Sequence, residues 1–142
     1  VHRYMGRISG PLMDRIDLHV EVTPVPPQEL SEAQPGEPSA AVRARVVRAR
    51  EVQARRFQGE CGVYTNAMMN TAMLREYCRP DEAGRQLLER AMERLSLSAR
   101  AYDRILKVAR TIADLAEREE ISAQDIAEAI GYRSLDRESW GV

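Results

Sequence analysis

Hydrophobic and polar residues alternate over a short segment near the start of the chain. In "SGPLMDRIDLHVEV", Ser9 to Val22, every second residue from Ile16 onward is apolar and the residues between are charged or histidine. This period of two predicts a β-strand over Ile16–Val22. No other segment has the pattern of a partner for it, so the strand is an orphan whose backbone groups lack a ladder. We therefore expect the chain to be a piece of a longer protein that supplies the sheet.

A proline-rich stretch separates this strand from the rest of the chain. Residues 23–39, "TPVPPQELSEAQPGEPS", hold five of the seven prolines. Proline fixes φ and removes a backbone donor, so this stretch is predicted to be an extended linker. From Ala40 to Arg133 the only proline is Pro80, and the apolar spacing becomes helical.

The helical spacing predicts a small bundle of four or five helices. The first spans roughly Ala40–Phe57. Later helices are predicted to begin at Asn66, at Pro80–Asp81, at Ser98 and at Ser122, where Asp125 completes a capping box. The apolar side chains expected in the core are Val42, Val46, Ala49, Val52, Phe57, Met69, Ala72, Met73, Tyr77, Leu87, Leu88, Ala91, Met92, Leu95, Tyr102, Ile105, Leu106, Ala109, Ile112, Ala113, Ala116, Ile126, Ala129 and Ile130. The predicted fold class is mainly α: one orphan β-strand, a Pro-rich linker and a small helical bundle.

The composition agrees with this fold and argues against several classes of function. Hydrophobic residues make up 44% of the 142 residues and aromatic residues 5%, so the core must be aliphatic. The formal net charge of -1 argues against general binding of polyanions by the whole chain. Cys61 and Cys78 form no CxxC motif and the two histidines have no ligand spacing, so we expect no metal site and a reduced, cytoplasmic setting. No apolar run approaches the roughly 20 residues of a membrane span. The sequence contains neither a phosphate-loop motif nor a nucleophile motif.

Two arginines are candidates for contact with phosphate, one at the start of the predicted strand and one at the start of a predicted helix. Arg15, in "LMDRIDL", stands between Asp14 and Asp17, and either projects toward a phosphate on a neighbouring subunit or forms a surface ion pair with these aspartates. Arg100 lies in the first turn of the helix capped by Ser98, where the helix dipole already favours anions. Arg104 and Lys107 follow on the polar face of the same helix. The alternative interpretation is that this basic face is simply solvated, as in most amphipathic helices.

The first predicted helix is rich in arginine. Six arginines between Arg43 and Arg56 accompany a single acid, Glu51. Such a face either contacts nucleic acid or neutralises an acidic linker or partner surface. The candidate residues for a nucleic-acid or partner contact are Arg43, Arg45, Arg48, Arg55 and Arg56.

Three blocks of the sequence follow one another in a distinctive order: "ISGPLMDRIDLHVEV", "RARVVRAREVQARR" and "LSLSARAYDRILKVARTIADLAEREEISAQDIAEAIGYRSLDR". Together they resemble the C-terminal part of the magnesium-chelatase-like AAA+ ATPases of the competence protein ComM (YifB) type. The resemblance covers most of the chain. It implies a Lon-protease-like domain and an ATPase core with a phosphate loop ahead of this segment.

The resemblance also implies a division of the chain. Residues 1–22 would end the ATPase core, residues 23–39 would be the linker, residues 40–133 the helical lid and residues 134–142 a tail. Arg15 would then be an arginine finger that acts in trans, in a motif where Met13 replaces the usual leucine. Arg100 would be the sensor-2 arginine of the lid, with Arg104 as a second candidate for nucleotide contact.

The resemblance implies that this chain is part of an ATP-dependent AAA+ motor. The parent would bind ATP with Mg²⁺, form a ring that resembles the hexamers of related motors, and act as a DNA branch-migration helicase in natural transformation. Without a phosphate loop, this segment alone is expected to hold no cofactor and to hydrolyse no ATP. The alternative is a non-enzymatic helical module that binds DNA or docks on a protein.

Overall fold

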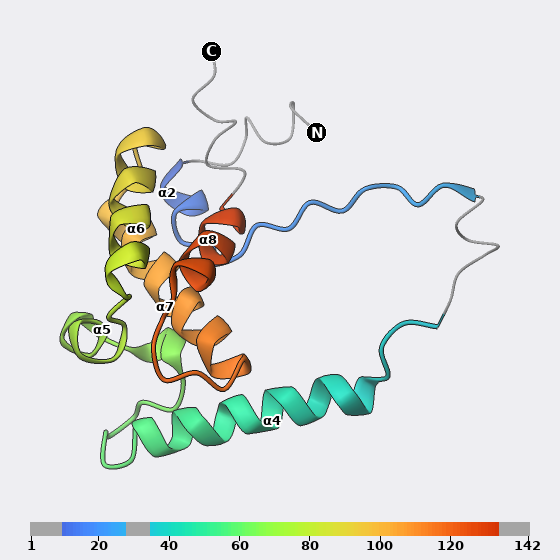
Figure 1. Ribbon diagram of the computed structural model, residues 1–142, viewed down its shortest axis with the longest axis horizontal. Coiled ribbons are helices and arrows are strands. Elements are labelled where there is room, and N and C mark those ends of the chain that lie inside the picture. The colour runs from blue at the N-terminus through green and yellow to red at the C-terminus, as the bar shows by residue number, and fades with distance from the viewer. Residues whose placement is uncertain (1–9, 28–34, 134–142) are drawn as a thin grey trace.

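The structure is a computed structural model that describes residues 10–27 and 35–133. The described elements are helices, which confirms the mainly α fold (Figure 1). In chain order they are α2 (Gly10–Met13), α4 (Ser39–Arg56), the 3₁₀ turn η1 (Asn66–Met68), α5 (Thr71–Tyr77), α6 (Glu82–Arg94), α7 (Ala99–Leu115) and α8 (Ala123–Gly131). None of these helices is long and apolar enough to cross a membrane.

The helix starts follow the capping residues, with one correction. Ser98 accepts a hydrogen bond from the Ala101 N–H, and Ser122 and Asp125 form the predicted capping box. Asp81 caps α6 by accepting from the Gly84 N–H. The prediction that Asn66 caps the second helix is wrong, because Asn70 accepts from the Met73 N–H and begins α5 four residues later.

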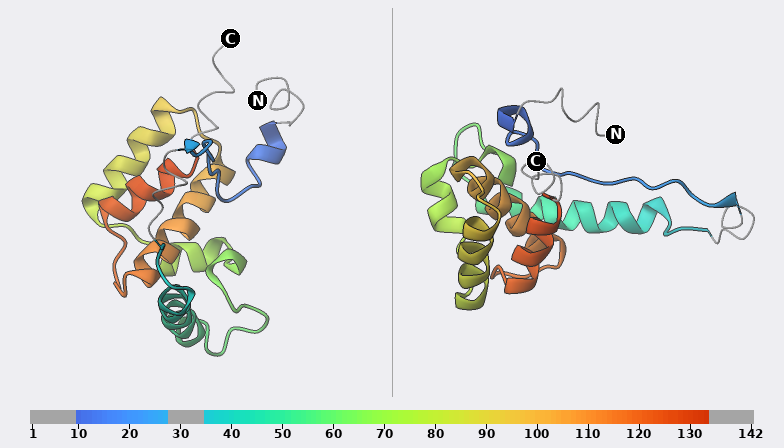
Figure 2. Two further views of the ribbon diagram at one scale, coloured as in Figure 1. Left: turned by 90° about the vertical axis from the view of Figure 1, so that its right-hand side faces the viewer. Right: turned by 90° about the horizontal axis from the view of Figure 1, so that it is seen from above.

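Helix α7 lies at the centre of the bundle and contacts α4, η1, α5 and α8, while α6 packs against α8 (Figures 1 and 2). Its buried face carries the predicted stripe, with Ile105, Leu106, Ala109 and Ala113 in the core. Tyr102 and Ala116 were expected on this face, but they lie exposed at its two ends. The other apolar residues of the core are Phe57, Met69, Met73, Leu74, Cys78, Leu88, Ile121, Ile126 and Ala129.

The predicted apolar stripe of α4 is only half correct. Ala49 and Phe57 are buried, but Val42 and Val46 are 40% and 45% exposed. The reason is geometric: the C-terminal half of α4 packs on α7, whereas its N-terminal half extends beyond the bundle (Figures 1 and 2). Gly59 and Gly62, with φ of 94° and 78°, then turn the chain back toward the bundle.

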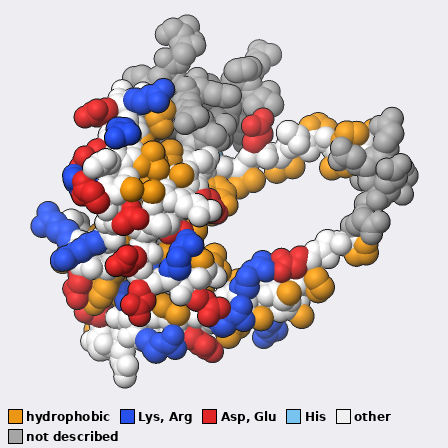
Figure 3. Space-filling model, viewed as in Figure 1, with side chains coloured by type: hydrophobic (Ala, Val, Ile, Leu, Met, Phe, Trp, Pro, Cys, Tyr) orange, Lys and Arg blue, Asp and Glu red, His pale blue; other side chains and the backbone are white. Residues whose placement is uncertain are grey.

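The segment predicted as a strand, Ile16–Val22, is extended but belongs to no strand. The described residues offer no neighbouring strand with which its backbone could form a ladder. Its apolar side chains Leu18, Val20 and Val22 are exposed, and hydrophobic atoms line this part of the surface in Figure 3. The beginning of the segment is not free, however, because the His19 N–H donates to the Tyr132 carbonyl oxygen at the end of α8 (2.7 Å).

Candidate functional site

Arg15 lies in the turn that follows α2, and its side chain is exposed. The two aspartates beside it face other cations. Asp17 forms an ion pair with Arg104 of α7, and Asp14 Oδ1 lies 3.9 Å from Arg133 Nη2. Among the described residues Arg15 itself has no ion pair. The alternative that Arg15 pairs with its neighbouring aspartates is therefore not what the structure shows.

Arg100 lies in the first turn of α7 and is also exposed, with no ion pair to any described residue. At this end of a helix, backbone N–H groups carry partial positive charge. A cation placed there is favourable only when an anion joins the site. The combination of free guanidinium and helix terminus therefore suits a phosphate group.

The polar face of α7 beyond Arg100 is not simply solvated. Arg104, one turn further on, holds Asp17, and Lys107 Nζ donates to the Ala67 carbonyl oxygen at 2.9 Å. Both residues tie separate segments of the chain to α7. Since Arg15 is two residues from Asp17 and Arg100 is one turn from Arg104, the ion pair brings the segments of the two free arginines together.

The arginines of α4 divide into two groups. Arg45 pairs with Glu37, Arg48 with Glu117 and Arg56 with Asp114. The remaining three are exposed and have no ion pair among the described residues: Arg43, Arg50 and Arg55. Three of the five candidate arginines, Arg45, Arg48 and Arg56, are thus neutralised within the chain.

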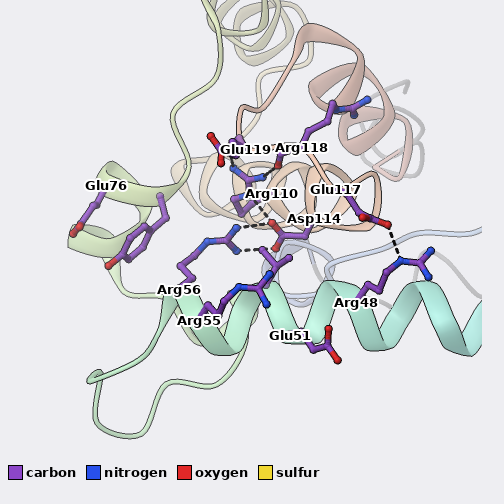
Figure 4. A pocket seen from close by; sticks show the side chains of 12 residues that line it. Arg48, Glu51, Arg55, Arg56, Glu76, Arg110, Asp114, Glu117, Arg118 and Glu119 are labelled. Atoms are coloured by element: carbon purple, nitrogen blue, oxygen red, sulfur yellow. Dashed lines mark hydrogen bonds and ion pairs between the residues drawn. The ribbon is translucent and has the colours of Figure 1, made fainter.

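A buried polar cluster joins α4, η1 and α7, and the sequence analysis missed it. Asp114 is fully buried and accepts hydrogen bonds from three side chains (Figure 4). The Arg56 guanidinium donates twice, at 2.7 and 2.5 Å, the Asn66 amide donates at 2.8 Å, and Arg110 Nε donates at 3.1 Å. The signal that could have indicated it is the i,i+4 pair Arg110–Asp114.

Arg110 is almost fully buried within this cluster. Its two Nη groups donate at 2.6 Å to the carbonyl oxygens of Glu119 and Arg118, which follow the end of α7. Burial lowers the pKa of Arg110 from its usual value, while Asp114 acts in the opposite direction. Arg110 therefore fastens the α7–α8 connection to the body of α7.

An open hollow of about 780 Å³ lies over this cluster (Figure 4). Four of its five arginines are already engaged: Arg56 and Arg110 with Asp114, Arg48 with Glu117, and Arg118 with Asp125. Arg55 is its one arginine without an ion pair to a described residue. The hollow is consequently lined by a structural network of ion pairs, and it is not suited to bind an anion.

Thiol and metal chemistry find little support in the described residues. Cys61 is exposed, whereas Cys78 is buried, and burial raises the pKa of the Cys78 thiol to about 12. The Cys78 thiol is therefore protonated and unreactive at neutral pH. The described part of the chain holds no group of three or more His, Cys, Asp or Glu side chains placed to bind a metal ion.

Two family models match the chain. Residues 36–133 match the C-terminal model of the magnesium chelatase subunit ChlI, and residues 1–30 match the model of the magnesium chelatase subunit ChlI itself. The first match covers the whole helical bundle, and the second covers the segment that contains Arg15.

Several curated proteins are similar over nearly the whole chain. YifB of Escherichia coli is 43% identical over 136 residues, and the competence protein ComM of Haemophilus influenzae is 42% identical over 138 residues, which are 95% and 96% of the chain. A protein of Mycobacterium bovis is 40% identical over 92% of the chain. The chain spans 26% of the length of each of these relatives.

Proposed function

The chain belongs to the magnesium-chelatase-like family of the ComM (YifB) type, and from this premise we propose that it supplies the lid and the arginine finger of an AAA+ ATPase. In this proposal, residues 1–22 end the ATPase core, residues 23–39 are the linker, residues 40–133 are the lid and residues 134–142 are a tail. The observation that carries the proposal is the state of Arg15 and Arg100. Both are exposed and without ion pairs among the described residues, whereas Arg104 and Arg133 pair with the aspartates on either side of Arg15.

The residues present fit the phosphates of a nucleotide. Arg15 and Arg100 offer two free guanidinium groups, and the N–H groups of the first turn of α7 lie beside Arg100. When bound, ATP with Mg²⁺ supplies the phosphoryl group to be transferred. We propose that Arg100 binds and orients the phosphates as the sensor-2 residue of the lid.

Arg15 has a different role in this proposal. A guanidinium held at the edge of a subunit can stabilise the negative charge that develops on a transferring phosphoryl group in the neighbouring site. That role requires an assembly of subunits, and we propose a ring, with six subunits as in related motors. The parent is proposed to be a cytoplasmic protein that uses ATP to move DNA branches, in keeping with its relative named as a competence protein.

A second function rests on the free arginines of α4. Arg43, Arg50 and Arg55 would give a non-enzymatic module a small basic surface for DNA or for an acidic protein. This alternative requires no phosphate loop in the protein. An in-frame GxxxxGK[ST] motif in the preceding coding sequence would favour the ATPase, and an unrelated domain there would favour the module.

Substitution of the two arginines in a full-length protein tests the proposal. Arg15→Ala should leave nucleotide binding largely intact and lower the turnover rate by roughly 10³–10⁵, the range for arginine fingers. Arg100→Ala should instead weaken nucleotide binding or slow the chemical step within its own site. Nucleotide affinity and steady-state turnover, measured on both variants, separate the two effects.

Mixed assemblies provide the control. Subunits with Arg15→Ala, combined with subunits that lack the phosphate-loop lysine, should recover part of the activity, because each variant completes a site with the other. If mixed rings form and stay as inactive as either variant alone, Arg15 does not act across subunits.

A further inference from the structure

The segment around Arg15 is held on both sides by the lid. Residues 14–19 have no helical or strand hydrogen bonds after the turn that ends α2. Their contacts reach residues 87 to 117 positions later in the chain: Asp17 to Arg104, and the Ile16 carbonyl oxygen to Arg133 Nη1 at 3.0 Å. The His19 N–H adds its hydrogen bond to Tyr132. Arg15 sits among these contacts and takes part in none of them through its side chain.

Arg133 is the deepest of these contacts. It follows the end of α8, and its side chain is only 1% exposed. A buried guanidinium is costly unless it is paired and hydrogen-bonded. Arg133 Nη1 donates a hydrogen bond to the Ile16 carbonyl oxygen, and the Asp14 carboxylate lies at an ion-pair distance of 3.9 Å from Nη2, so both of these contacts are with residues adjacent in sequence to Arg15. The position just after α8 also favours a cation, because the helix C-terminus carries partial negative charge.

Arg104 secures the other side of Arg15. Its ion pair with Asp17 joins two half-buried side chains, at 32% and 45% exposure. The contact alone is modest in a partly solvated setting. The contact matters for position, because it ties Asp17, two residues after Arg15, to α7, the helix that presents Arg100.

We propose that Arg104 and Arg133 are positioning residues that hold the backbone of residues 14–19 against α7 and α8, and so fix Arg15 relative to the lid. The inference rests on the proposed role of Arg15 as a finger. It gives Arg104 a role through Asp17 instead of contact with nucleotide. The lid of one subunit thereby orients the arginine that serves the neighbouring site, and movement of the lid carries Arg15 with it.

Hydrogen exchange on this chain tests the contacts without any ATPase activity. Arg104→Gln and Asp17→Asn should each make the His19 amide exchange at least about twofold faster, and combining them should add little further. Arg133→Gln should have a larger effect, and the two variants at the half-exposed pair keep the test valid if Arg133→Gln fails to fold. Arg90→Gln, at an exposed position on α6, is the matched control and should leave the His19 amide unchanged. Unchanged exchange in Arg104→Gln and Asp17→Asn would overturn the inference, whatever Arg15 does.

Kinetics on a full-length protein test the consequence. Arg104→Gln should lower turnover by about 10- to 100-fold, as expected for a misplaced group, with nucleotide affinity changed by less than about twofold. It should have almost no further effect in an Arg15→Ala background, and exchanging the charges, Asp17→Arg with Arg104→Asp, should restore part of the activity. A loss of nucleotide affinity in Arg104→Gln would overturn the positioning role. Faster exchange at His19 together with full turnover in Arg15→Ala would instead show that the contacts exist and that the proposed finger fails.

Discussion

At the scale of single residues, the molecule separates arginines that stabilise its interior from arginines that remain available to a ligand. Arg110 is buried and Arg56 is partly buried around Asp114, and their side chains are 4% and 12% exposed. Arg48, which is also on α4, forms an ion pair with Glu117 that is exposed to solvent. The energetic consequences of the two arrangements differ, because a buried charge that loses its partner keeps its desolvation penalty.

This contrast gives a prediction for stability. Asp114→Asn should lower the free energy of unfolding by about 3–5 kcal/mol, because it leaves the buried Arg110 guanidinium and the partly buried Arg56 guanidinium without a counter-charge. Glu117→Gln, three residues later, removes a surface ion pair and should cost no more than about 1 kcal/mol. Denaturant unfolding of both variants measures the difference. A cost below about 1 kcal/mol for Asp114→Asn would mean that hydrogen bonding alone maintains the cluster.

The sequence could predict the exposed arginines better than the buried ones. The sequence indicated Arg100 because the helix dipole disfavours a cation in the first turn of a capped helix. It did not indicate Asp114 and Arg110, since an i,i+4 pair of opposite charges is typical of solvated helix faces. Only the packing of α4 and η1 over that face, which no local pattern encodes, turns the pair into a buried cluster. Arg133 was missed for the same reason.

At the scale of elements, capping and apolar periodicity located most helices. Ser98, Asp81 and the Ser122–Asp125 box each begin a helix as predicted. The strand and the α4 stripe differ because both depend on partners. Among the residues that the structure describes, Ile16–Val22 has strand alternation without a neighbouring strand, and the first half of α4 has valines without a facing helix. Periodicity indicates which face is apolar, but not whether another element covers it.

Matched truncations in two helices test this difference. Ile105→Ala in α7 should lower the free energy of unfolding by about 2–5 kcal/mol, because Ile105 is fully buried in the core. Val46→Ala in α4 should cost less than about 0.5 kcal/mol, because Val46 is 45% exposed and on the projecting half of the helix. Thermal or denaturant unfolding of this chain provides both values. A large loss for Val46→Ala would show that α4 has a partner within the chain.

At the scale of the whole molecule, charge distinguishes the two proposed functions. The formal net charge is -1, and three of the six arginines of α4 are paired with carboxylates. The chain as a whole therefore has little general attraction for polyanions. An ATPase lid needs none, whereas a DNA-binding module must neutralise phosphates and release counterions.

The salt dependence of DNA binding by this chain decides between these functions. For the lid we expect weak binding to duplex DNA, with a slope of log Kobs against log salt smaller in magnitude than about 1. A module that uses Arg43, Arg50 and Arg55 would neutralise three phosphates and give a slope of about −2.7, since each contributes about −0.9. Replacing these three arginines by Gln would then abolish the slope, whereas the control Arg45→Gln with Arg48→Gln would preserve it, because both residues already face carboxylates. A steep slope that responds to the first set and not to the second would favour the DNA-binding module over the ATPase lid.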